Sequence, residues 1–115
     1  MRNFHRPGRS VAVAEQAMAA TSHPAATLAA LDVLKAGGNA LDAAIAAVAL
    51  QGVVEPAMTG IGGDCFCLIG RAGQPVVAFN GSGRAPAAAT IDRFEGDGRS
   101  SLDGSVHAVT LPGAV

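Results

Sequence analysis

The sequence predicts a mixed α/β fold, and three observations support this prediction. Hydrophobic residues make up 50% of the 115-residue chain, which is typical of a globular protein. Leu28, Leu31 and Leu34 recur at a spacing of three and give the apolar stripe of an amphipathic helix. Cys65 to Ile69 is a short apolar run of strand length that follows a glycine-rich turn. Helical and strand patterns therefore occur in one short chain.

The first elements are a short strand and a capped helix. Val11 to Ala14 has the β-branched pattern of a strand. Pro24 suits the first turn of a helix, where its missing N–H would have no partner, and Ser22 is the expected N-cap. Lys35 is favoured by the helix dipole in the last turn, and Gly37-Gly38 supplies a left-handed terminating residue. The sequence therefore predicts one helix between Pro24 and Lys35.

A second helix should begin directly after the glycine pair. Asn39 is its N-cap, and Asp42 three residues later forms an approximate capping box. The run from Ala40 to Leu50 is apolar on nearly every face, so we expect this helix to be buried. The apolar stretch ends near Val54 and is shorter than the roughly 20 residues that span a membrane. A core helix is the better interpretation.

The second half of the chain is expected to be mostly strands and loops. Cys65 to Ile69 predicts a buried strand, residues 71–74 predict a hairpin turn, and Val76 to Phe79 predicts the returning strand. Residues 106–110 predict the start of a further strand. Loops are expected at residues 80–83 and 95–101.

Composition argues against several classes of partner. The net charge of −1 and the 3% aromatic content give neither the field nor the stacking surface that binds nucleic acid, and they do not favour an anionic membrane.

Residues 1–10 are basic but lack the apolar core of a secretory signal, so we interpret them as a flexible amino terminus and the protein as cytoplasmic. Cys65 and Cys67 share one face of a strand but lack a companion pair, so we predict no metal site.

Four motifs in fixed order carry a family resemblance: Ser22-His23-Pro24, Gly37-Gly38-Asn39, Val54-Glu55-Pro56 and Gly60-Ile61-Gly62-Gly63-Asp64. Together they resemble the amino-terminal part of the large subunit in the γ-glutamyltranspeptidase family, over about residues 11–115. The resemblance implies that residues 11–115 are an incomplete portion of an amino-terminal-nucleophile hydrolase, a four-layer αββα sandwich when complete.

The resemblance also implies a chemistry. Family members are precursors that cleave themselves and expose a threonine nucleophile, whose own α-amine is the base. That threonine and the oxyanion glycines would lie beyond Val115, so we expect no catalytic residue in this chain and no activity from the chain alone. The implied reaction moves a γ-glutamyl or related acyl group from an amide such as glutathione to water or an amine, through an acyl-threonine intermediate and without a cofactor. The implied partners are that amide substrate and the remainder of the precursor, including the small subunit.

Two residues are candidates for substrate binding. The family typically grips the substrate α-carboxylate with the arginine of an Arg-Glu-x-Ala-Pro segment. If Ala85-Pro86 is aligned with that Ala-Pro, Ser82 occupies the arginine position and Arg84 comes two residues later. In an extended segment a shift of two keeps the same face and moves the side chain by roughly 7 Å. Arg84 would then bind a carboxylate, with Ser82 donating a hydrogen bond nearby, and the alternative is a surface arginine.

Several other motifs receive structural rather than chemical interpretations. Thr21-Ser22-His23 resembles the family's processing site, but we interpret it as the junction before the first helix. The Gly60 to Asp64 loop has the wrong strand and helix order for phosphate, so its glycines are expected to allow close backbone packing. Glu55, Asp64, His23 and His107 are assigned no catalytic role.

Two alternatives to glutathione-type transfer stay open. One is a related amidohydrolase or acylase that acts on another carboxylate-bearing amide, and the other is a non-catalytic assembly module. Because the sequence stops at Val115 directly after an apparent strand, we expect a truncated product or a partial sequence.

Overall fold

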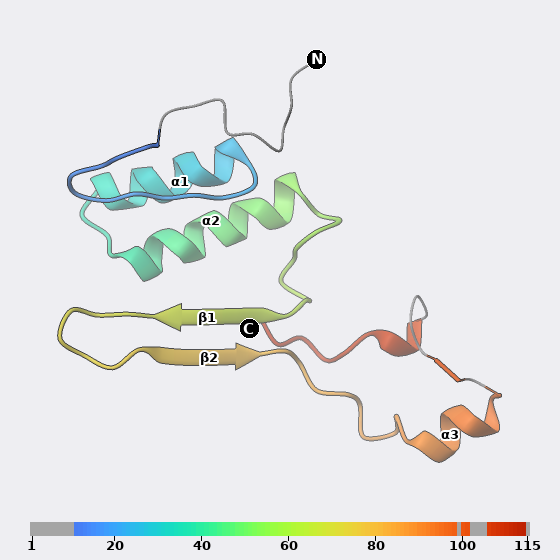
Figure 1. Ribbon diagram of the computed structural model, residues 1–115. Helices are drawn as coiled ribbons and strands as arrows, with labels where there is room; N and C mark the ends of the chain where they lie inside the picture. Colours follow the sequence, from blue (N-terminus) through green and yellow to red (C-terminus); the bar gives the residue numbers. More distant parts are fainter. Residues whose placement is uncertain (1–10, 99, 102–105, 115) are drawn as a thin grey trace. The chain divides into compact units, whose positions relative to one another are not determined.

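A computed structural model describes residues 11–98, 100–101 and 106–114. The chain forms two compact units, one ending at Ala47 and the other beginning at Val48. The segment predicted to be a flexible amino terminus, residues 1–10, lies outside the described residues. The elements, in chain order, are helices α1 (Pro24–Lys35) and α2 (Ala40–Val54), strands β1 (Cys65–Ile69) and β2 (Val77–Gly81), helix α3 (Ile91–Gly96) and the 3₁₀ helix η1 (Val106–Ala108) (Figure 1).

Helix α1 begins at Pro24 as predicted, but its cap is His23 and not Ser22. The backbone of His23 is extended, with φ −118° and ψ 131°, and its Nδ1 accepts the N–H of Ala25 at 3.2 Å. The hydroxyl of Thr21 donates to the carbonyl of His23 at 2.7 Å and lies 2.7 Å from the hydroxyl of Thr27. The prediction for Ser22 is wrong because the imidazole of the next residue, His23, accepts one of the free N–H groups of the first turn, that of Ala25. Thr21 and His23 thus have a structural role where the helix begins.

The carboxyl end of α1 closes in a Schellman motif. Gly37 has φ +91°, and its N–H donates to the carbonyl of Leu34 at 3.1 Å. The N–H of Gly38 reaches back to the carbonyl of Val33 at 2.9 Å. These are the two bonds that define the motif, and the left-handed residue between them is the glycine that the sequence predicts.

Asn39 and Asp42 form the predicted capping box of α2. The side-chain oxygen of Asn39 accepts the N–H groups of Leu41 and Asp42 at 2.8 and 3.0 Å. In return, the carboxylate of Asp42 accepts the backbone N–H of Asn39 at 3.3 Å and its side-chain amide at 2.7 Å. This reciprocal pair satisfies free N–H groups of the first turn and fixes where α2 begins.

A cluster of alanines forms the core of the first unit. The prediction that α2 is buried is wrong for most of its surface, because only Ala43 and Ala47 are buried and Ile45 is 60% exposed. Alanine side chains let two helix backbones approach closely, but they cover little of the bulkier residues beside them. Among the described residues, no helix is long and apolar enough to cross a membrane. The buried alanines are Ala26, Ala30, Ala43 and Ala47, with Ala19, Val33 and Leu34 packed at the margin.

Strands β1 and β2 form the predicted hairpin, but the prediction that β1 is buried is wrong, because none of its residues is buried. They pair antiparallel, with Phe66 opposite Asn80 and Cys67 opposite Phe79. The turn is closed by the N–H of Gln74, which donates to the carbonyl of Arg71 at 3.0 Å, and Gly73 within it has φ +70°. Strand β2 begins at Val77, one residue later than predicted, and continues to Gly81. Both faces of this two-stranded sheet carry exposed apolar side chains: Phe66, Leu68, Val77 and Phe79.

Two predicted strands are absent from the described residues, and one helix was not predicted. Residues 11–14 form no regular element, and residues 106–108 form a 3₁₀ helix instead of a strand. A strand is held by hydrogen bonds to a neighbouring strand. Among the described residues, neither segment has a partner strand. Helix α3 begins after Thr90, whose hydroxyl accepts the N–H of Arg93 at 3.4 Å. Its local signals are this cap and Asp92 in the first turn.

Candidate functional site

Both predicted substrate-binding residues lie in the loop that leaves β2. The side-chain oxygen of Asn80 accepts the N–H of Ser82 at 3.1 Å, which turns the chain as the strand ends. Ser82 and Arg84 are exposed, and Gly83 between them has φ +64°. The structure thus brings the two exposed candidates into one loop that follows Gly81, the last residue of β2.

The left-handed Gly83 changes one expectation about this loop. An extended segment would place Ser82 and Arg84 on the same face. Strand β2 ends at Gly81, and the positive φ of Gly83 interrupts the alternation of side chains two residues later. The assumption of an extended segment is therefore wrong, and the spacing of roughly 7 Å drawn from strand geometry does not apply.

A second segment, residues 110–114, runs beside this loop. The N–H of Leu111 donates to the carbonyl of Arg84 at 2.9 Å. The N–H groups of Gly113 and Ala114 both donate to the carbonyl of Gly63, each at 3.1 Å. Segment 110–114 therefore joins the loop that precedes β1 to the loop that follows β2.

The closest backbone approaches in this region occur at three glycines. A Cβ on Gly113 would collide with the carbonyl of Gly81 and the backbone nitrogen of Gly83, and a Cβ on Gly83 would collide with the carbonyl of Leu111. The sequence pattern predicts close backbone packing at the Gly60 to Asp64 loop. Gly60 and Gly62 have open space where a Cβ would stand, whereas a Cβ on Gly63 would stand 3.3 Å from the carbonyl oxygen of Gly60. The prediction therefore holds only at Gly63, and the tighter approaches in this region are at Gly81, Gly83 and Gly113.

The charged side chains of the described residues make few polar contacts. Among the described residues, the ion pair that forms joins Lys35 to Asp32 at 4.0 Å, so the guanidinium of Arg84 faces no described carboxylate at that range. Asp64 accepts a long hydrogen bond of 3.5 Å from the hydroxyl of Thr110. Glu55 accepts the side-chain amide of Gln51 at 2.9 Å.

The two cysteines form no described metal site. Cys65 and Cys67 are free thiols of intermediate burial on one face of β1. No group of three or more potential metal ligands occurs among the described residues.

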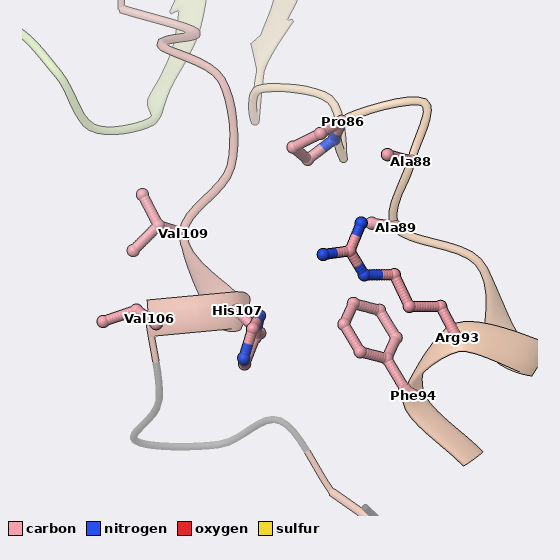
Figure 2. Close-up of a pocket in the computed structure, with 8 residues that line it drawn as sticks. All are labelled: Pro86, Ala88, Ala89, Arg93, Phe94, Val106, His107 and Val109. Carbon is pink, nitrogen blue, oxygen red and sulfur yellow. The ribbon is translucent and has the colours of Figure 1, made fainter. Parts of the chain in front are cut away.

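A shallow pocket of about 190 Å³ lies beside α3 and was not predicted from the sequence. Figure 2 shows its apolar walls, with Arg93 extending toward Ala89. The rings of Phe94 and His107 meet edge to face, with centroids 5.6 Å apart and planes 62° apart. This contact gives His107 a packing role. The pocket is lined by Pro86, Ala88, Ala89, Arg93, Phe94, Val106, His107 and Val109.

Comparison with known proteins identifies relatives of this chain. The sequence profile of the gamma-glutamyltranspeptidase family matches residues 26–115. The glutathione hydrolase-like YwrD proenzyme of Bacillus subtilis (strain 168) is 41% identical over 99 residues, which cover 85% of this chain and 19% of that protein. The oxamate amidohydrolase proenzyme of Klebsiella pneumoniae is 37% identical over 103 residues, covering 90% of this chain and 20% of that protein. The chain thus spans about a fifth of the length of these curated relatives.

A solved structure gives the same result for the fold. The crystal structure of Helicobacter pylori gamma-glutamyltranspeptidase superposes with a TM-score of 0.81 and 34% sequence identity, covering 92% of this chain and 32% of that one. The predicted fold class, a partial amino-terminal-nucleophile hydrolase fold, is confirmed by this likeness. The chain belongs to the gamma-glutamyltranspeptidase family.

Proposed function

We propose that this chain is the amino-terminal part of the large subunit of a self-cleaving precursor. The mature enzyme transfers a γ-glutamyl or related acyl group from an amide donor such as glutathione to water or an amine. The observation that carries the proposal is the family match over residues 26–115, together with relatives that are named glutathione hydrolase proenzymes.

The proposed chemistry is acyl transfer through a threonine ester. The hydroxyl oxygen of the new amino-terminal threonine attacks the amide carbonyl while its α-amine takes the hydroxyl proton. The amide C–N bond breaks, the leaving amine receives that proton, and an acyl-threonine ester remains. Water or an acceptor amine then attacks the ester and restores the hydroxyl. The nucleophile lies outside this chain, so the chain alone has no activity and contributes to substrate binding.

Within this chain, Arg84 is the proposed ligand of the donor carboxylate. A guanidinium suits a carboxylate because two N–H groups donate in parallel to its two oxygens. The side chain of Arg84 is exposed and forms no ion pair with a described carboxylate, so its donors are available to a ligand. Ser82 is the second proposed donor, from the same loop.

The test uses the complete precursor that contains this chain, with two chromogenic donors. L-γ-Glutamyl-p-nitroanilide carries the α-carboxylate, and 4-aminobutyryl-p-nitroanilide is the same donor without it. We expect the precursor to cleave itself and to prefer the γ-glutamyl donor. Arg84→Ala should raise KM for that donor at least about tenfold, as the loss of a charge-assisted bidentate contact predicts, with a smaller change in kcat. Ser82→Ala should raise KM less.

Arg71 provides a matched control, because it is also an exposed arginine but lies in the hairpin turn. Arg71→Ala should leave both kinetic constants within about twofold, as substitutions of exposed residues away from a site usually do. Equal rates with the two donors, or equal effects of Arg84→Ala and Arg71→Ala, would overturn the role of Arg84. A precursor that neither cleaves itself nor releases p-nitroaniline would overturn the proposed reaction.

The alternative function is hydrolysis of a different carboxylate-bearing amide. It is favoured by the 37% identical relative named an oxamate amidohydrolase proenzyme and by the displacement of Arg84 from the family's arginine position. Ammonia release from oxamate by the same precursor decides between the two. A higher kcat/KM for oxamate than for the γ-glutamyl donor would favour this alternative.

A further inference from the structure

Segment 110–114 contacts the proposed substrate loop through its backbone. We propose that this segment is a positioning clamp for Arg84, so that Thr110, Gly83 and Gly113 set the affinity for the donor carboxylate without touching the substrate. The proposal rests on the proposed function of Arg84. We call residues 110–114 the clamp segment.

The clamp segment is attached at both ends. Near its start, the N–H of Leu111 donates a hydrogen bond of 2.9 Å to the carbonyl of Arg84. Near its end, the carbonyl of Gly63 accepts two N–H groups, from Gly113 and Ala114, at 3.1 Å each. Gly63 is close in sequence to β1, the strand that pairs with β2. The backbone of Arg84 is therefore tied, through the clamp segment, to the loop before the neighbouring strand.

The clamp segment and the loop approach each other most closely at Gly83 and Gly113, which have no side chain. The space beside the α-carbon of Gly83 is filled by the carbonyl of Leu111 and by the side chain of Thr110, whose hydroxyl oxygen would stand 2.8 Å from an added Cβ. The corresponding space at Gly113 is filled by the carbonyl of Gly81. Gly83 also has φ +64°, which an L side chain rarely adopts. A methyl group at either glycine must therefore push the clamp segment away from the loop.

The side chain of Arg84 makes this attachment important. Arg84 is exposed and has no ion-pair partner among the described residues, so its backbone is the part that the clamp holds and the point from which the guanidinium reaches a ligand. A binding group that is held loosely loses affinity, because more freedom must be given up when the ligand binds. The clamp should therefore act on KM for a carboxylate-bearing donor and have little effect on the chemical step, whose nucleophile is proposed to lie elsewhere.

Two pairs of substitutions in the complete precursor test this proposal. Gly113→Ala adds a methyl group inside the clamp, and Gly70→Ala adds one in open space with no positive φ. Gly83→Ala combines positive φ with collision, and Gly73→Ala has positive φ, +70°, in open space. For the γ-glutamyl donor, we expect each clamp variant to raise KM at least about fivefold more than its control, with kcat within about twofold. KM for the 4-aminobutyryl donor should not change.

A double-mutant cycle with Arg84→Ala separates this proposal from the proposed function. If the clamp acts through Arg84, then Gly113→Ala raises KM in the wild-type background but has no further effect in the Arg84→Ala background. Additive effects, equal effects on both donors, or a fall in kcat alone would overturn the clamp while leaving the role of Arg84 intact. No effect of Arg84→Ala on KM would instead overturn the role proposed for Arg84, and the clamp with it, while leaving the proposed reaction to its own test.

Thr110→Ala tests the clamp proposal if the glycine variants do not accumulate as folded precursor. This substitution removes the hydroxyl group that lies beside Gly83 and adds no atoms, so it loosens the clamp without a collision. We expect KM for the γ-glutamyl donor to rise about two- to threefold, and Thr110→Ser to restore part of the loss. Unchanged KM in Thr110→Ala would overturn the proposal.

Discussion

Replacing Gly38 by alanine tests how tightly the end of α1 is closed. An added Cβ would stand 2.5 Å from Cγ1 of Val33 and 3.0 Å from its carbonyl oxygen. The same carbonyl accepts the N–H of Gly38 at 2.9 Å in the Schellman motif. The substitution therefore strains a side chain and a hydrogen bond of the same residue.

The expected loss follows from these two contacts. Moving Val33 away from its rotamer costs about 0.5–1.5 kcal/mol, and weakening one hydrogen bond costs about 0.5–1.5 kcal/mol. Alanine also reduces the entropy of the unfolded chain relative to glycine, which offsets about 0.4–1 kcal/mol. The free energy of unfolding should therefore fall by about 0–2.6 kcal/mol, centred at about 1.3 kcal/mol. With an m value of about 2 kcal/mol/M, this central value lowers the urea midpoint by about 0.7 M.

The measurement is urea denaturation of the 115-residue chain, followed by far-UV circular dichroism. Gly70→Ala is the control, because its added methyl group meets no atom within 4 Å, and its midpoint should stay the same or rise slightly. In a Val33→Ala background the Cγ1 contact is gone, so Gly38→Ala should cost clearly less there. Equal midpoints for Gly38→Ala and Gly70→Ala, or strict additivity with Val33→Ala, would refute the reasoning.

Three further predictions concern the caps, the core and the thiols. Asn39→Ala removes the acceptor of two N–H groups and should lower the free energy of unfolding by about 0.5–2 kcal/mol in the same assay. Asn39→Ser keeps an acceptor and should retain most of the wild-type stability. Ala30→Leu overfills the alanine cluster and should cost about 1–3 kcal/mol, whereas Ala44→Leu, at an exposed position of α2, should cost little. Cys65 and Cys67 should both be alkylated by iodoacetamide without a reductant, as peptide mass spectrometry would show, and recovery of a disulfide-linked pair would contradict this.

Local signals in the sequence predicted the helices α1 and α2 and the hairpin, but not the short helix α3. Pro24, Gly37 and Asn39 act through bonds within a few residues, and such bonds form in the same way whatever the rest of the chain does. The turn at residues 71–74 is equally local, so the register of β1 and β2 follows from it. Strands predicted at residues 11–14 and 106–110 failed, because a β-branched pattern does not say whether a partner strand is present.

The candidate site was only partly predictable for the same reason. The sequence places Ser82 and Arg84 in one segment, but it does not reveal that residues 110–114 lie beside them, since that contact joins positions far apart in the chain. Gly83 offered one signal, because a glycine between two polar residues permits the left-handed turn that the structure contains. The roles of Arg84 and Ser82, and the cytoplasmic location, stay predictions.

The two-faced hairpin has a practical consequence for handling the chain. Phe66 and Leu68 are 68% and 77% exposed on one face, and Val77 and Phe79 are more than half exposed on the other. Strands with uncovered apolar faces and unpaired edges attract further copies of themselves, so self-association should grow with protein concentration. Solution work on the chain should therefore begin with a dilution series. Denaturation curves should be compared only at protein concentrations low enough that the midpoint no longer depends on concentration.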